Sequence, residues 1–142
     1  MRILGLDYGE KRIGVAICDD RGMTARPVGT IVRKYWKRDI ERIDECVREH
    51  GAEKIVVGYP VRLDGTEGIQ CEKVNRFIDA LEKGVSVPVA KWNEALSTKE
   101  AEALLREADM NPRKRKAVVD KLAAAIILQD YLDHISDHSK IP

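Results

Sequence analysis

Residues 2–19 read RILGLDYGEKRIGVAICD, and this stretch carries most of the information about the fold. Residues 2–7 form a short apolar run that ends at an acid before a Tyr-Gly pair, which is typical of a buried strand entering a turn. Residues 14–19 repeat the pattern, and residues 26–32 can form a third strand with Pro27 at its beginning or on an edge. Three strands with short links predict an antiparallel meander at the start of the domain.

Helices and strands alternate in the rest of the chain. Short β-branched runs predict two further strands, at residues 54–58 and 85–92. Apolar residues at helical spacing predict helices that surround these strands, over residues 40–50, 74–84, 97–108 and 113–134. This order predicts an α/β domain built on a mixed sheet that helices cover. We expect one domain over residues 1–135 and a short C-terminal tail over residues 136–142.

The composition is that of a compact soluble domain. The chain has 142 residues, of which 44% are hydrophobic and 35% are charged, so it can bury a core and is not expected to be disordered. Its 25 Lys and Arg nearly balance its 24 Asp and Glu, so the net charge of +1 indicates no partner. No apolar run approaches the ~20 residues of a membrane helix. The three widely spaced cysteines indicate reduced thiols, and we expect a cytoplasmic protein without a membrane partner.

Three acids occupy unusual positions in this pattern. Asp7 ends the first strand, Glu94 follows the last strand, and Asp120 lies in the final helix among small apolar residues. Ligands bind beyond the carboxyl ends of parallel strands in open α/β sheets, and all three carboxylates could meet there. Converging carboxylates repel one another, and Mg²⁺ or Mn²⁺ would remove that repulsion because both prefer oxygen ligands. Two such ions could clamp the attacking and leaving oxygens of a phosphodiester.

Other interpretations of these acids are open on the pattern alone. Asp7 could cap a turn, Glu94 could be solvated, and Asp120 could be a buried ion-pair partner. Asp7-x-Gly9 with Gly14 is similar to the phosphate loop of actin-like ATPases, but those proteins need a second domain that 142 residues cannot supply. No Walker A motif is present.

Two basic runs favour an anionic ligand. Residues 33–38, RKYWKR, contain four cations and two aromatic rings without an acid, and residues 113–116, RKRK, begin the final helix. Positive charge at a helix N-terminus opposes the helix dipole, so its presence there suggests that an anion compensates it. Aromatic rings among cations can stack the bases of single-stranded nucleic acid. The alternative is a solvated charged face.

Four motifs together resemble one protein family. They are LGLDYGEKRIGVA at residues 4–16, IVVGYP with DGTEG at 55–68, NEALST at 93–98, and KRK with DKLAAAIILQ at 114–129. The chain resembles the YqgF/RuvX family of Holliday-junction resolvases, whose members are also described as pre-16S ribosomal RNA processing nucleases. The match spans nearly the whole chain in the right order. It implies a ribonuclease-H-like fold with a mixed five-stranded sheet and helices on both faces.

The resemblance also assigns roles to individual residues. It implies that Asp7, Glu94 and Asp120 are the catalytic acids and bind Mg²⁺ or Mn²⁺ in a two-metal nuclease site. We expect the nucleic acid to be bound by ten residues: Lys11, Arg12, Asp64, Gly65, Ser97, Thr98, Arg113, Lys114, Arg115 and Lys116.

The third motif departs from the family pattern at two positions. The family usually has an acid before the central Glu and an Arg after it, where this chain has Asn93 and Ala95. If the Arg contacts a phosphate, its loss weakens substrate binding. If the acid orients a metal, its loss weakens metal binding. The catalytic acids themselves are all present.

These features predict a metal-dependent endonuclease that processes the 5′ end of pre-16S rRNA. The alternatives are a resolvase of branched DNA and a nucleic-acid-binding module without catalysis. Ribosomal precursor particles are expected partners of an rRNA nuclease, and the protein would be a monomer or a weak homodimer. Phosphate contacts carry no sequence information, so the sequence does not decide between RNA and DNA.

Overall fold

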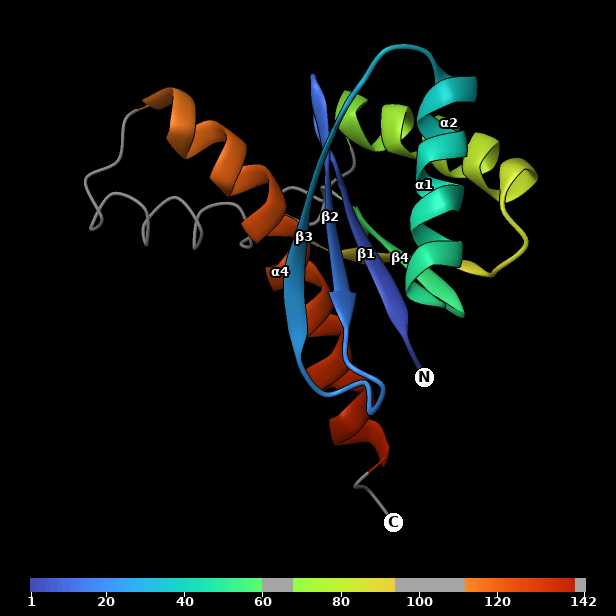
Figure 1. Cartoon of the computed structure of the whole chain (residues 1–142), viewed down its shortest axis with the longest axis vertical. Coiled ribbons are helices and arrows are strands. Elements are labelled where there is room, and N and C mark those ends of the chain that lie inside the picture. Colours follow the sequence, from blue (N-terminus) through green and yellow to red (C-terminus); the bar gives the residue numbers. More distant parts are fainter. Residues whose placement is uncertain (60–67, 94–111, 140–142) are drawn as a thin grey trace.

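The computed structural model describes residues 1–59, 68–93 and 112–139. Five strands and three helices lie in these ranges (Figure 1). In chain order they are β1 (Ile3–Tyr8), β2 (Arg12–Cys18), β3 (Ala25–Val32), α1 (Trp36–His50), β4 (Lys54–Tyr59), α2 (Ile69–Gly84), β5 (Val89–Asn93) and α4 (Pro112–Ser139).

The strands form one mixed sheet in the order β3-β2-β1-β4-β5. Strand β2 pairs antiparallel with both β1 and β3, so the predicted meander is confirmed. Strand β4 then adds parallel to β1, and β5 adds parallel to β4. Strand β3 lies on an edge of the sheet, as Pro27 predicted, because proline has no N–H for a second ladder. The carboxyl ends of β1, β4 and β5 therefore share one end of the sheet.

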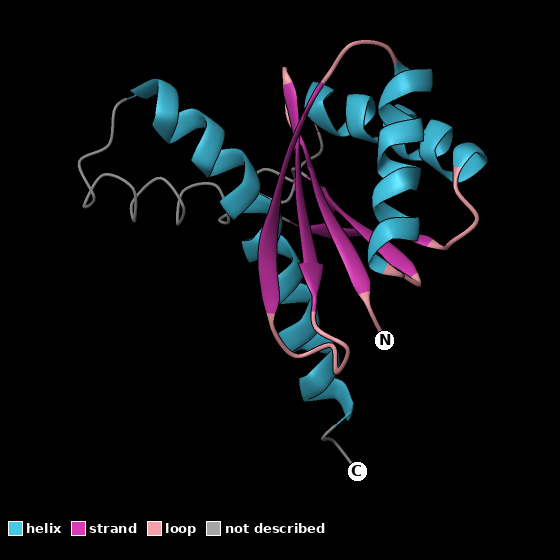
Figure 2. Cartoon of the chain, viewed as in Figure 1, coloured by secondary structure: helices cyan, strands magenta, loops and turns pink. Residues whose placement is uncertain are grey.

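Helices cover both faces of the sheet, as Figure 2 shows. Side chains alternate along a strand, and β1 follows this rule. Leu4 and Leu6 are fully buried in the core on the face that carries α1 and α2. Ile3 belongs to a second core on the opposite face, against α4. The two buried faces explain why the central strands have continuous apolar runs.

Helix α4 lies unusually close to β1 at Gly5. A Cβ atom at Gly5 would lie 2.8 Å from the Cβ of Leu128 and 3.1 Å from the carbonyl oxygen of Ala124. Further along α4, Tyr131 is hydrogen-bonded to Lys54, which is the register partner of Ile3. The later residue of the helix, Tyr131, thus lies near the earlier residue of the strand, Ile3, so α4 and β1 are antiparallel.

Several element boundaries differ from the sequence prediction. Strand β5 begins at Val89 and not at Val85, because Pro88 lacks the N–H that a ladder requires. Helix α4 continues through Ser139, so four residues of the predicted tail are helical. The helix predicted over 97–108 lies outside the described residues. Gly51 ends α1 as predicted, with a φ of 64° that suits glycine.

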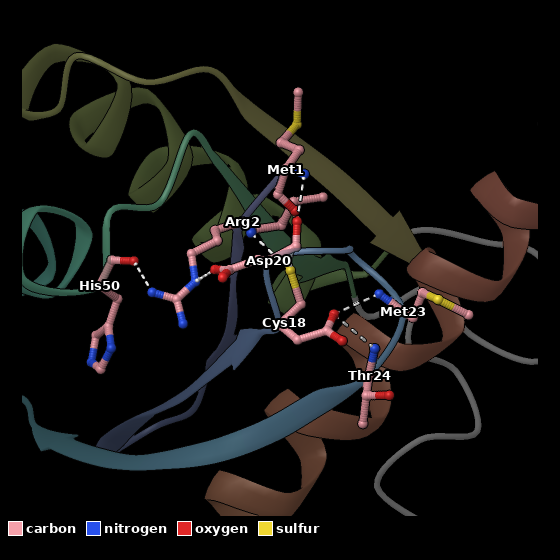
Figure 3. A network of polar contacts seen from close by, with 9 residues as sticks. Met1, Arg2, Cys18, Asp20, Met23, Thr24 and His50 are labelled. Carbon is pink, nitrogen blue, oxygen red and sulfur yellow. Dashed lines mark hydrogen bonds and ion pairs between the residues drawn. The ribbon is translucent and has the colours of Figure 1, made fainter.

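Polar contacts close the end of the sheet where β1 begins (Figure 3). The terminal amine of Met1 donates to the backbone carbonyl of Asp20, and Arg2 Nε lies 3.0 Å from an oxygen of the Asp20 side-chain carboxylate. Arg2 also donates to the carbonyl of His50, at the end of α1. The Met23 N–H donates to the Asp19 carboxylate and lowers its pKa. This network of side chains and backbone groups joins the start of β1, the end of β2 and the end of α1.

The cysteines are free thiols, as predicted: Cys18 and Cys71 are buried and Cys46 is half-buried. Burial raises the pKa of the Cys46 thiol above its usual value. Among the described residues, no helix has the length and apolar character that crossing a membrane requires.

The contact at Gly5 predicts a large difference between two glycine substitutions. Gly5→Ala should lower the free energy of unfolding by about 1–3 kcal/mol, because the new methyl group overlaps a helix that must move. Gly29→Ala in β3 is the matched control, since a Cβ there meets nothing within 4 Å. Urea unfolding of both variants measures the difference. Equal stability of the two would show that α4 does not press on β1.

Candidate functional site at the carboxyl end of β1

Asp7 lies near the carboxyl end of β1 and is half-buried. Its register partner on β2 is Gly14, which leaves the space beside the carboxylate free of a neighbouring side chain on that strand. Because β1 alternates and Leu6 enters the core under α1 and α2, Asp7 is on the other face, with Ile3 and Gly5. The carboxylate therefore belongs to the face that α4 covers.

Position 120 of α4 lies at the same end of the sheet as Asp7. The contacts at Gly5 come from Ala124 and Leu128, and position 120 is one turn before Ala124 on the same side of the helix. One helical turn spans about 5.4 Å, and the two residues from Gly5 to Asp7 span about 6–7 Å of strand. The antiparallel course of α4 thus brings the backbone at position 120 toward Asp7.

The third predicted acid follows directly after β5. Its predecessor Asn93 is the last residue of that strand and pairs with Tyr59 at the end of β4. Both strands run parallel to β1, so Asn93 lies at the same end of the sheet as Asp7. Five predicted site residues lie outside the described residues: Glu94, Asp64, Gly65, Ser97 and Thr98. Ala95, the second departure from the family motif, lies outside them as well.

The predicted basic residues approach this end from two sides. Lys11 is exposed in the turn between β1 and β2, and Arg12 is half-buried at the start of β2. The Gly9 N–H donates to the Arg12 carbonyl at 2.9 Å and closes that turn. Residues 113–116 form the beginning of α4, which Figure 1 shows in orange on the same side of the molecule as the carboxyl end of β1. The β1–β2 turn and the backbone at the start of α4 therefore lie at the same end of the molecule.

Tyr8, the residue after Asp7, is the centre of an aromatic stack on the opposite face. Its ring lies parallel to the buried ring of Phe77, with centroids 4.2 Å apart. The guanidinium of Arg33 lies over Tyr8, 4.3 Å from the ring centroid, so the two make a cation–π pair. The indole N–H of Trp36 donates to the Tyr8 hydroxyl at 3.3 Å. These contacts attach the basic segment 33–38 to the strand that carries Asp7.

Arg33 and Asp39 hold that segment in one conformation. Arg33 donates to the carbonyl of Gly9 at 2.9 Å and to that of Glu10 at 2.6 Å, which joins it to the β1–β2 turn. The Asp39 side chain is only 2% exposed and accepts the Lys34 N–H, at 3.1 Å from one oxygen and 3.3 Å from the other. The segment is therefore anchored at both ends by buried or half-buried groups.

The chemistry of this end suits a hard divalent cation. Carboxylate oxygens are the ligands that Mg²⁺ and Mn²⁺ prefer, and Asp7 supplies one beside the position of a second, Asp120. Within the described side chains, no three His, Cys, Asp or Glu residues cluster as a metal site. The described side chains include that of Asp7 but not those of Glu94 and Asp120.

Sequence reasoning missed two residues of this region. The sequence pattern places Tyr8 at the start of a turn, whereas the structure includes it in β1, where the alternation of side chains directs it to the face opposite Asp7. Asp39 was not singled out, although it is the acid that ends a run of cations in the first turn of a helix. An acid in the first turn interacts favourably with the helix dipole and can accept hydrogen bonds from backbone N–H groups.

Comparisons with known proteins agree on one family. Residues 1–134 match the model of the family described as RuvX, Holliday junction resolvase. A protein of Syntrophus aciditrophicus (strain SB) named "Putative pre-16S rRNA nuclease" is 60% identical over 142 residues, which is 100% of this chain and 94% of that protein. A protein of Halothermothrix orenii with the same name is 51% identical over 134 residues, covering 94% of this chain and 96% of its own.

Solved structures of resolvases share the fold. RuvC of T. thermophilus in complex with a Holliday junction substrate aligns with a TM-score of 0.58 at 18% identity, over 95% of this chain and 96% of that one. The fowlpox virus Holliday junction resolvase aligns with a TM-score of 0.56 at 16% identity, over 95% and 99% of the two chains. The predicted ribonuclease-H-like α/β fold is confirmed.

The buried carboxylate of Asp39 predicts a graded response to substitution. Asp39→Ala should lower the free energy of unfolding by about 1–3 kcal/mol, because the Lys34 N–H loses its acceptor. Asp39→Asn should cost less, because its amide oxygen can still accept that hydrogen bond. Chemical denaturation of both variants provides the comparison. If Asn were as harmful as Ala, the negative charge and not the acceptor would hold the segment.

Proposed function

The chain belongs to the RuvX family, and we propose that this nuclease is a metal-dependent endonuclease that hydrolyses phosphodiester bonds of precursor 16S rRNA. The observation that carries the proposal is the arrangement around Asp7. A half-buried carboxylate at the end of β1 shares its face with α4, whose antiparallel course brings position 120 to the same end. Strand β5 ends there too, one residue before Glu94.

Asp7, Glu94 and Asp120 are the proposed ligands of Mg²⁺ or Mn²⁺. When bound, such ions supply positive charge that stabilises the attacking and leaving oxygens of a phosphodiester, in the two-metal manner. The fold contributes the positions of the ligands. Asp7 has a place in a central strand, and the packing of α4 against Gly5 sets the course of the helix backbone that carries position 120.

Basic side chains around the carboxylates are proposed to hold the phosphates that flank the cleaved bond. Lys11 and Arg12 lie on one side of Asp7, and residues 113–116 lie at the N-terminal end of α4. Asp64 and Gly65 would border the groove, and Ser97 and Thr98 would contribute hydroxyl groups. Since these contacts neutralise phosphates, binding should weaken steeply with salt.

Precursor 16S rRNA is the favoured substrate because the relatives at 60% and 51% identity carry that substrate in their names. Ribosomal precursor particles in the cytoplasm would then be the partners, and a monomer would suffice. The second candidate is branched DNA, which the description of the family favours. Resolution of a junction would require two sites and therefore a dimer. Asn93 and Ala95 favour a third reading, a binding module without catalysis.

Cleavage should depend on Asp7 without the fold depending on it. Asp7→Asn removes a negative charge but keeps the shape of the side chain, so we expect loss of cleavage with an unchanged circular dichroism spectrum. Asp20→Asn is the matched control, because this exposed acid lies at the opposite end of the sheet. A folded Asp7→Asn protein with preserved turnover would refute the mechanism.

The substrate and the metal can be determined in one assay. Purified protein should cut a pre-16S RNA in Mn²⁺ or Mg²⁺, should not cut in EDTA, and should lose activity in Asp120→Asn. A four-way DNA junction offered in parallel tests the second candidate, and preferential cutting of the junction would transfer the assignment to it. Tight binding without cutting in either metal would indicate the non-catalytic module.

A further inference from the structure

We propose that Tyr35, with Lys34 and Lys37 beside it, is a binding platform for single-stranded nucleic acid next to the cleavage site. The three residues are called the Tyr35 platform below. The proposal rests on the proposed function because the bound strand would be the flank of the nuclease's substrate. None of the three is among the ten residues expected to bind nucleic acid, although they lie in the basic run 33–38 whose rings could stack bases.

The first observation is the exposure of Tyr35. Its side chain is 62% exposed, and within the described residues it makes no hydrogen bond or ring contact. Trp36, the next residue, is 40% exposed, but its indole N–H is engaged with Tyr8. A tyrosine ring offered to solvent next to a second exposed ring is an apolar surface that the fold does not use. An exposed aromatic ring among cations offers a face on which a nucleic-acid base can stack.

The second observation is the charge around the ring. Residues 33–38 contain four cations and no acid, and the acid that follows them, Asp39, is buried against the Lys34 backbone. Arg33 and Arg38 have structural partners, since Arg33 joins the β1–β2 turn and Arg38 lies 3.7 Å from Asp39. Lys34 and Lys37 are exposed. Their charge is thus available to a phosphate backbone.

The third observation is that hydrogen bonds hold the segment that carries the platform on both sides of Tyr35. Arg33 is fixed to the Gly9 and Glu10 carbonyls, Trp36 to the Tyr8 hydroxyl, and the Lys34 N–H to Asp39. Tyr35 lies between these anchors, at the residue before α1. Because the residues on both sides of Tyr35 are held, binding to its ring does not have to order the segment, which lowers the entropic cost of binding.

The platform is continuous with the proposed cleavage site. The Arg33 N–H donates to the Lys11 carbonyl at 2.9 Å, and Lys11 is one of the expected phosphate contacts. Trp36 and Arg33 both touch Tyr8, the residue after Asp7. Figure 1 shows the loop from β3 to α1 above the carboxyl end of β1. A strand leaving Asp7 past Lys11 would therefore reach Tyr35.

The chemistry selects a single strand over a duplex. An exposed ring binds a base by stacking on its face, which is free in a single strand and covered in a duplex. Flanking lysines contact phosphates without regard to sequence, so the expected ligand is any unpaired stretch of nucleic acid. An acidic protein would be attracted by the lysines alone and would not need the ring.

The test is fluorescence anisotropy of the full chain with a labelled 20-nucleotide single-stranded RNA, in EDTA so that nothing is cut. Tyr35→Ala should raise Kd at least about fivefold, because one base loses its stacking partner. Tyr35→Phe keeps the ring and should bind like the wild type. Met23→Ala is the control for loss of an exposed apolar side chain, since Met23 is 64% exposed at the opposite end of the sheet.

The contribution of Lys34 and Lys37 is measured in the same assay by the salt dependence of Kd. The double variant Lys34→Gln, Lys37→Gln should reduce the slope of log Kd against log salt by about 1.4, which is about 0.7 for each lost phosphate contact with a single strand. Arg21→Gln with Arg26→Gln removes the same charge near the far turn and should leave the slope unchanged. Circular dichroism verifies that each variant is folded.

Three results would overturn the platform: no binding of the RNA by the wild type, equal Kd for Tyr35→Ala and Tyr35→Phe, or equal loss of affinity for a duplex of the same length. The last would show that charge or fold, and not stacking, is responsible. Failure of the proposed function looks different. In that case the wild type binds the RNA with the expected dependence on Tyr35 but does not cut it when Mg²⁺ or Mn²⁺ is added.

Discussion

The close approach of α4 to β1 at Gly5 is the constraint on which the site depends. With no side chain at Gly5, the helix backbone at Ala124 and the side chain of Leu128 rest directly on the strand. This contact sets both the distance and the register of the helix, and α4 is also held at β5, where the Trp92 indole donates to Asp130 at 2.8 Å. The placement of position 120 near Asp7 is a consequence of this packing.

Side chains alternate along β1, so two neighbouring residues at its carboxyl end face opposite sides of the sheet. Asp7 is on the α4 face, while Tyr8 is on the other face, where it stacks on Phe77 and its ring carries the Arg33 guanidinium. The first face carries the carboxylate of the proposed metal site, and the second carries rings and a cation. A central strand serves both because β2 and β4 hold it on its two sides and leave its end free.

Much of this arrangement could be predicted from the sequence. The features that could not be predicted have a common cause. Apolar runs and turn residues located the strands because burial on both faces leaves a continuous apolar signal, as at residues 54–58. Asp7 was recognisable for the same reason, because it is the acid that ends the apolar run of β1. The role of Asp39 was not, because its burial depends on a backbone N–H five residues away that only the folded turn brings to it. Likewise, Pro88 delays β5 through a missing ladder donor that hydrophobicity alone does not reveal.

The opposite orientation of Asp7 and Tyr8 has a consequence for the mechanics of any substrate. A polynucleotide that meets the carboxylates on one face and the Tyr35 platform beyond the other must fold over the end of the sheet within a few nucleotides. Double-stranded DNA is stiff over about 150 base pairs, so such a sharp bend is costly for an intact duplex. A strand with an unpaired stretch or a junction at that point bends freely. With both proposed sites in use, the geometry of one strand end would select substrates by their local compliance, before any base is recognised.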